Sequence, residues 1–186
     1  MALLNRFLKG WRVASGGVLA AALSVGVAAS HPLEYAVKAN FLYKFAPFVD
    51  WPPNAFPQAG APFNVCVLGS APFGTSLDQA TRGQTVGAHA VAVRRINVVT
   101  PASGCHVLYV GRSDTQRAPD ALAAVHGEPV LTVTDASQGV SGGMIHFVVR
   151  DGRVRFIISP DVAKTHGLSI SSKLLSLAVE IRKGGA

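Results

Sequence analysis

Three short apolar runs constrain the fold of this chain more than any other feature of its sequence. They occupy residues 63–69, 105–110 and 129–133, and turn-forming residues flank them, which is typical of buried β-strands. Residues 73–81 and 119–126, which lie between the runs, have weaker helix-like patterns. Short buried strands that alternate with short helices predict an α/β fold with a mostly parallel central sheet and flanking helices.

An amphipathic helix is predicted over residues 33–48. Its apolar positions recur at steps of four, four and three, which places them on one helix face: Val37, Phe41, Phe45 and Phe48. We expect Lys38 and Lys44 on the polar side of this helix. Pro47 ends it, because proline cannot continue the helical hydrogen-bond ladder. A further strand, with one irregular step, is predicted over 89–99.

A β-hairpin is predicted around Asp151-Gly152, because this dipeptide supplies the positive φ values that a two-residue turn needs. The turn fixes the register, so that alternate residues share a face. One face is wholly apolar and is expected to lie in the core: Ile145, Phe147, Val149, Val154, Phe156 and Ile158. The other face carries His146, Val148, Arg150, Arg153, Arg155 and Ile157. This second face is either a solvated outer surface or a basic, partly apolar contact patch for an acidic partner.

A last helix is predicted from the helical spacing of Ile170, Leu174, Leu177 and Ile181, with Ser169 or Ser171 as its N-cap. The chain has 186 residues, of which 49% are hydrophobic, and this excludes a disordered chain. The length suits one α/β domain, expected over residues 30–186, with the hairpin and a helix at its C-terminal end.

The first 29 residues have the pattern of a secretory signal peptide. Arg6 and Lys9 precede an uncharged stretch over 13–29 that ends in small residues. A retained membrane anchor and a cytosolic helix are the alternatives. Cleavage at about residue 30 lowers the net charge from +7 to +4. That charge, together with export, argues against a nucleic-acid partner.

The only two cysteines, Cys66 and Cys105, lie in the part of the chain that export would retain. An oxidising compartment favours a disulfide between them. The alternative is two buried free thiols, since both cysteines lie in apolar runs where a free thiol packs well. Their spacing does not predict a metal site.

Catalytic motifs are weak. Ser141 formally matches a Gly-x-Ser-x-Gly pattern, with Asp161 and His166 following in hydrolase order. A nucleophile of this kind needs a turn from a strand into a helix, whereas this segment leads into the predicted hairpin, so a glycine-rich loop is the better interpretation. We therefore expect a protein that is not an enzyme, without cofactor or metal; a secreted hydrolase that uses Ser141 is the weaker alternative.

Several blocks of the sequence, taken together, resemble the YfiR family. They fall in the family's order and cover nearly all of the chain beyond residue 30: 41–52, with the proline exit Phe-Val-Asp-Trp-Pro; 65–69 followed by Pro-Phe-Gly at 72–74; 104–110; 129–135; Gly-Gly-Met-Ile at 142–145; and Leu-Ser-Ile-Ser-Ser-Lys-Leu-Leu-Ser-Leu at 168–177.

The resemblance implies a periplasmic α/β regulator without catalytic activity. The family's namesake binds the periplasmic domain of an inner-membrane diguanylate cyclase and holds it inactive, and an OmpA-like outer-membrane lipoprotein can sequester it. Members can form homodimers, and their redox state is tied to cysteines. Cys66 and Cys105 match one family cysteine pair; the second pair has no counterpart, because residues 140–149 contain no cysteine.

The implied function is repression of a membrane diguanylate cyclase, which lowers cyclic di-GMP and biofilm signalling. His146, Arg150, Arg153 and Arg155 are the candidate partner-binding residues. The alternative function is a periplasmic small-ligand sensor coupled to a membrane kinase.

Overall fold

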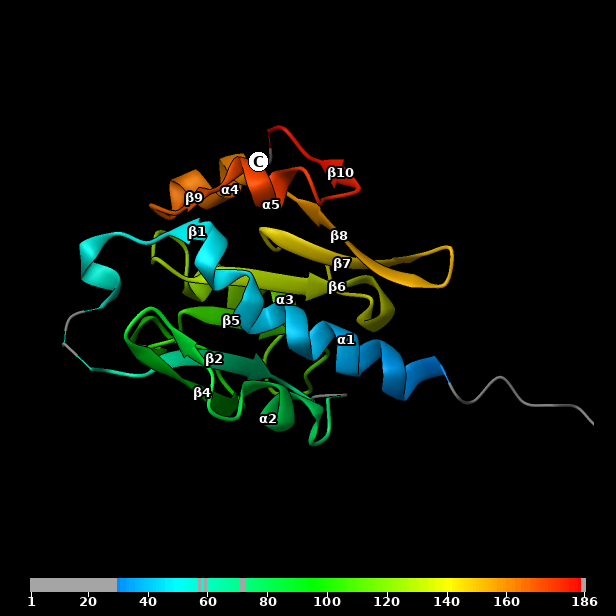
Figure 1. Ribbon diagram of the computed structural model, residues 1–186, viewed down its shortest axis with the longest axis horizontal. Coiled ribbons are helices and arrows are strands. Elements are labelled where there is room, and N and C mark those ends of the chain that lie inside the picture. The colour runs from blue at the N-terminus through cyan, green and yellow to red at the C-terminus, as the bar shows by residue number, and fades with distance from the viewer. Residues whose placement is uncertain (1–29, 57, 59, 71–72, 185–186) are drawn as a thin grey trace, which may run out of the picture.

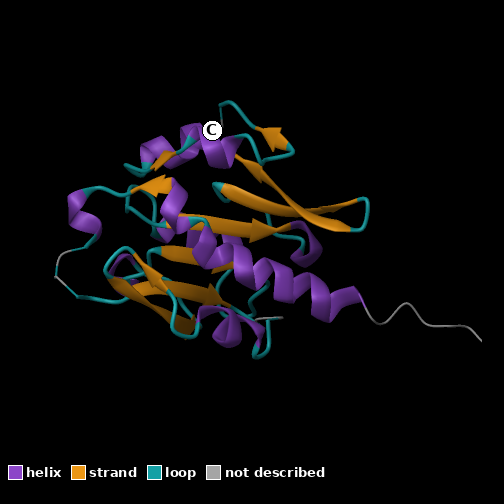
Figure 2. Ribbon diagram, in the orientation of Figure 1, coloured by secondary structure: helices purple, strands orange, loops and turns teal. Residues whose placement is uncertain are grey.

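A curled, mostly parallel sheet forms the centre of the protein (Figures 1 and 2). The computed structural model describes residues 30–184 apart from 57, 59, 71 and 72. In this described part, eight strands follow the order β10-β8-β7-β6-β5-β2-β4-β3. Their bounds are β2 (Phe63–Leu68), β3 (Thr85–Val86), β4 (His89–Ile96), β5 (Val107–Val110), β6 (Leu131–Asp135), β7 (Ile145–Arg150), β8 (Arg153–Ile158) and β10 (Glu180–Ile181).

Helices and two short strands complete the described fold. The helices are α1 (Ser30–Lys44), α2 (Ser76–Thr81), α3 (Ala118–Ala124), α4 (Pro160–Thr165) and α5 (Ser172–Leu175). Strands β1 (Val49–Asp50) and β9 (Ser169–Ile170) pair with each other outside the main sheet. The expected signal peptide, residues 1–29, lies outside the described residues. No helix among those described is long and apolar enough to cross a membrane.

The predicted fold class is confirmed. Strands β4, β2, β5, β6 and β7 run parallel, whereas β3 joins β4 and β8 joins β7 in antiparallel pairs. The hairpin register agrees with the prediction at every pair from Arg150 opposite Arg153 to Ile145 opposite Ile158. The predicted irregular step in β4 is wrong, because β4 pairs with β2 without interruption through Arg94 and Arg95.

Alternation along the strands divides the core into two layers. In β5, Val107 and Tyr109 belong to the layer that packs against α1, while Leu108 and Val110 belong to the layer on the α3 side. Figure 1 shows α1 lying across the sheet. Both faces are therefore covered, as parallel sheets require.

Helix α1 is buried on a different face from the one that its apolar spacing predicts. Lys38, expected on the polar side, has no exposed surface, whereas Val37 is 36% exposed. The buried positions of α1 include Tyr35, Lys38, Ala39 and Leu42. The helix is rotated from the expected orientation because Lys38 has its partners inside the protein.

Asp135, the last residue of β6, is the main partner of Lys38. The Lys38 ammonium donates to both carboxylate oxygens of Asp135, at 2.8 and 2.7 Å, and also to Glu34. The Tyr109 hydroxyl donates to Asp135 over 2.9 Å, and the Ser137 backbone N–H donates to it over 3.0 Å. Burial, followed by the nearby Asp135 charge, raises the pKa of Tyr109, so this hydroxyl stays protonated as a donor. The network ties α1 to the carboxyl ends of β5 and β6.

The predicted last helix is much shorter than its apolar spacing suggests. Ser171 is its N-cap, accepting from the Leu174 backbone N–H, but the helix ends at Leu175. Ile170 instead pairs with β1, and Ile181 pairs with β8. Leu177 is 62% exposed, so it is not part of a buried stripe. Glu180 and Ile181 pair with the edge of β8, although the local apolar pattern assigns Ile181 to the helix.

Replacement of Lys38 by Met tests the buried network. The Lys38→Met variant leaves the Asp135 carboxylate without its cation inside the protein, which should lower the free energy of unfolding by about 3–5 kcal/mol. Lys44→Met, on the exposed side of the same helix, should change it by less than about 0.5 kcal/mol. Urea unfolding of both variants measures the difference, and equal losses would contradict the role given to Lys38.

Candidate functional site

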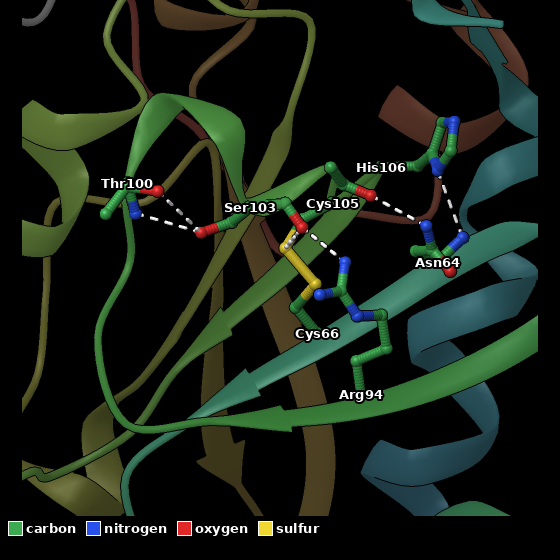
Figure 3. Close-up of a disulfide and its surroundings, with 8 residues drawn as sticks. Asn64, Cys66, Arg94, Thr100, Ser103, Cys105 and His106 are labelled. Atoms are coloured by element: carbon green, nitrogen blue, oxygen red, sulfur yellow. Dashed lines mark hydrogen bonds between the residues drawn. A yellow bond between two sulfur atoms is a disulfide. The ribbon is translucent and has the colours of Figure 1, made fainter.

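A disulfide joins Cys66 and Cys105, as the sequence predicted. The two Cα atoms lie 5.7 Å apart, and 39 positions separate the residues along the chain. Cys66 lies in β2 and Cys105 lies two residues before β5, so the bridge ties together two neighbouring parallel strands (Figure 3). Both side chains are buried in the layer on the α3 side of the sheet. The bridge is thus a brace within the core.

Polar contacts hold the chain around the disulfide. The Asn64 side-chain amide donates to the Gly104 carbonyl over 2.8 Å, and the Arg94 guanidinium donates to the Ser103 carbonyl. These contacts draw the segment before β5 toward β2 and β4 (Figure 3). The segment that carries Cys105 is therefore positioned by side chains of two strands, β2 and β4, and by the covalent bond.

His106 follows Cys105 and lies between aromatic rings. Its ring stacks on Phe56 at 4.8 Å and on Phe63 at 4.9 Å between centroids. Its Nδ1 accepts from the Asn64 backbone N–H over 3.0 Å, so Nε2 carries the proton and donates to the Ala55 carbonyl over 3.0 Å. Burial lowers the pKa of His106 below its usual 6.5. His106 is thus a neutral structural residue.

The four candidate partner-binding residues do not form one uniform surface. His146 is half-buried, and its Nδ1 lies 3.0 Å from the Thr134 hydroxyl. Burial, and then the charge of Arg182, lower the pKa of His146. Arg150 is exposed and pairs with Glu180 at 3.3 Å. Ile157, on the same face of the hairpin, is buried. This face is therefore not a fully solvated outer surface.

Arg153 and Arg155 differ from the other two candidates. Within the described part of the chain, neither guanidinium forms an ion pair with a carboxylate. Both residues line a groove of about 570 Å³ between the hairpin and α1. On the opposite face of the hairpin, Val149 is 47% exposed. The expectation that this apolar face is entirely core is wrong at Val149, next to the turn.

The glycine-rich segment around Ser141 has the expected position. It leads from the 3-10 turn Ala136–Gln138 into β7, and not from a strand into a helix. The Cβ of any larger residue at 143 would lie 3.0 Å from the Thr134 backbone nitrogen. Close packing of the loop on β6 accounts for the glycine there. Ser141 is exposed on this loop without the geometry of a nucleophile turn.

The Lys38–Asp135 network is the polar cluster that the sequence analysis missed. The available signal was a lysine inside an apolar helical pattern, together with an aspartate at the end of a buried strand. No group of three or more histidine, cysteine, aspartate or glutamate side chains suited to a metal occurs among the described residues.

Removal of the disulfide should destabilise the fold. The Cys66→Ala/Cys105→Ala variant frees a loop of about 40 residues in the unfolded chain, worth about 4 kcal/mol in the chain-entropy model. The expected result is a large fall in the urea midpoint with native circular dichroism retained in buffer. A urea midpoint equal to that of the wild-type protein would show that the disulfide does not stabilise the core.

Acidification should weaken the fold through His106, His146 and His166, whose pKa values are all lowered chiefly by burial. The folded state takes up these protons less readily than the unfolded state, so the stabilisation is complete above about pH 6.5 and falls as the pH decreases below it. Unfolding midpoints at pH 7.5 and 5.5, with NMR titration of the His106 ring, measure this. A His106 midpoint at or above 6.5 would contradict the stacking account.

Comparison with known proteins agrees with this architecture. No curated protein matches the chain. A similar solved structure is the ABC domain from Streptococcus pneumoniae in complex with L-Trp, with a TM-score of 0.51 and 13% identity over 77% of this chain. The match spans 62% of that chain, and at this identity it shows likeness of fold alone.

The family model described as YfiR/HmsC-like matches residues 35–179. That range runs from the first buried turn of α1 to the residue that precedes β10, and it includes the disulfide, the Lys38–Asp135 network and the hairpin. This family consists of periplasmic regulators and is regulatory rather than catalytic. The chain belongs to the YfiR/HmsC-like family.

Proposed function

We propose that this protein represses an inner-membrane diguanylate cyclase by binding the cyclase's periplasmic domain, which lowers cyclic di-GMP and biofilm signalling. The observation that carries the proposal is the family match over residues 35–179. The Cys66–Cys105 disulfide supports an oxidising compartment. We propose that residues 1–29 are the cleaved signal peptide that exports the chain to the periplasm.

In this proposal the protein acts by binding another protein, and it does not catalyse a reaction. The apolar face of the hairpin is packed in the core through Ile145, Phe147, Phe156 and Ile158, and the hairpin presents arginines toward the partner. Arg153 and Arg155 are better candidates than His146, which is half-buried against Thr134, or Arg150, which is paired with Glu180. A guanidinium without a carboxylate partner in its own chain is available to a carboxylate of another chain.

Two further partners belong to this proposal. An OmpA-like outer-membrane lipoprotein would relieve repression by sequestering the repressor from the cyclase, and a second copy of this chain would form a homodimer with the first. Both follow from the family resemblance.

A small-ligand sensor coupled to a membrane kinase is the second candidate function. A cavity of about 570 Å³ lies beside Tyr35, Phe73 and Ser137, in loops that follow the carboxyl ends of β2 and β6. Ligands of open α/β sheets commonly bind outside the carboxyl ends of the strands, at the point where the strand order reverses. β2 lies between β4 and β5, so the sheet has such a reversal there.

Deletion of the gene in its native host tests repression. Loss of the repressor should raise intracellular cyclic di-GMP, and re-expression of the exported protein should return it to the wild-type level. A matched strain that expresses the chain without residues 1–29 should not recover, because that protein cannot reach a periplasmic domain. Unchanged cyclic di-GMP on deletion would refute the repressor and direct attention to the ligand sensor.

A further inference from the structure

The groove between α1 and the hairpin has features of a binding site for an extended peptide segment. Its α1 wall contains Leu33, Val37 and Phe41, and its hairpin wall contains Val149 and Val154. Leu33 is 70% exposed and Val149 is 47% exposed. Apolar side chains gathered in an exposed groove are typical of an interaction site.

An unpaired strand edge runs along the same groove. β10 covers the outer edge of β8 only at its end, where Val179 and Arg182 donate to the carbonyls of Phe156 and Ile158. Alternate residues of a strand direct their backbone groups to the same side, so the next outward-facing N–H and C=O belong to Val154. No strand among the described residues pairs with them, and the Val154 carbonyl accepts only a long contact, 3.5 Å, from the Arg155 guanidinium. An edge of this kind accepts an added strand.

The charges at this edge specify what the added strand must carry. Arg153 and Arg155 lie on one face of β8, and Val154 lies on the other, facing α1. Glu34, the acidic residue of the groove, is already bonded to Lys38 and Ser137. Cross-strand neighbours share a face, so a strand beside β8 needs acidic residues opposite the arginines and apolar residues opposite Val154.

We propose that this groove binds an extended segment of the partner protein in which acidic and apolar residues alternate. The segment adds to β8 at Val154, its apolar side chains enter the space between Val37 and Val149, and its carboxylates pair with Arg153 and Arg155. This inference rests on the proposed function, because it names the chemistry by which the repressor recognises its cyclase.

A charge-swap binding experiment tests the groove directly. The probe is a fluorescein-labelled hexapeptide of alternating glutamate and valine, and its matched partner has lysine in place of glutamate. Anisotropy should show that Arg153→Glu/Arg155→Glu weakens binding of the glutamate peptide by about tenfold or more and gains binding of the lysine peptide. The control, Arg82→Glu/Arg112→Glu, makes the same change in net charge at exposed positions outside the groove and should bind as wild type does.

Val37→Asp gives a second, independent variant. It places a charge on the exposed apolar wall and should abolish peptide binding while the thermal unfolding midpoint stays within a few degrees of wild type. Equal binding by wild type, the arginine pair variant and Val37→Asp would overturn the inference, and so would failure of the glutamate peptide to bind wild type at millimolar concentration.

Complementation of the deletion strain separates this inference from the proposed function. If both hold, the two groove variants leave cyclic di-GMP as high as in the deletion, whereas the control variant lowers it. If deletion does not raise cyclic di-GMP but the peptide charge swap succeeds, the result supports peptide binding by the groove and refutes repression of a cyclase. If the groove variants repress as wild type does, the result supports repression of the cyclase and refutes recognition of the cyclase through the groove. A dimer that Val37→Asp converts to monomer in sedimentation would assign the groove to a second copy of this chain and overturn the inference.

Discussion

The ion pair between Lys38 and Asp135 fixes how the first helix lies on the sheet. A lysine ammonium without water is stable inside a protein only when carboxylates and hydroxyls take the place of solvent, and here Asp135, Glu34 and Ser137 do so. The pair holds α1 at a set rotation, with Val37 turned outward. The groove beside the hairpin exists because of that rotation.

Local signals predicted much of the fold. The Asp151-Gly152 turn fixed the register of the whole hairpin, because two residues decide which residues face each other. The buried strands were identified with shifts of one or two residues, since each is a continuous apolar run. The disulfide could be expected because the chain has two cysteines and an N-terminal pattern that predicts export.

The errors arose where distant partners decide the outcome. The sequence around Lys38 places it on the polar side of a helix, but its partner Asp135, 97 positions further along the chain, lies in the core and draws it inside. Ile181 has helical spacing from Leu177, yet the free edge of β8 takes it into a strand. Arg150 and Arg153 look equivalent in the sequence, and only Glu180 from the end of the chain distinguishes them. A short window of sequence does not show which distant residues come into contact.

The position of the disulfide also affects how the protein responds to cleavage. Cys66 and Cys105 close a covalent ring that contains α2, β3 and β4, the whole edge of the sheet beyond β2. A protease that cuts once within this ring produces two chains that stay linked, with the strands on both sides of the cut still attached to the core. Such a nicked molecule would keep its hairpin and α1 in place, and damage to that edge would leave the groove between them intact.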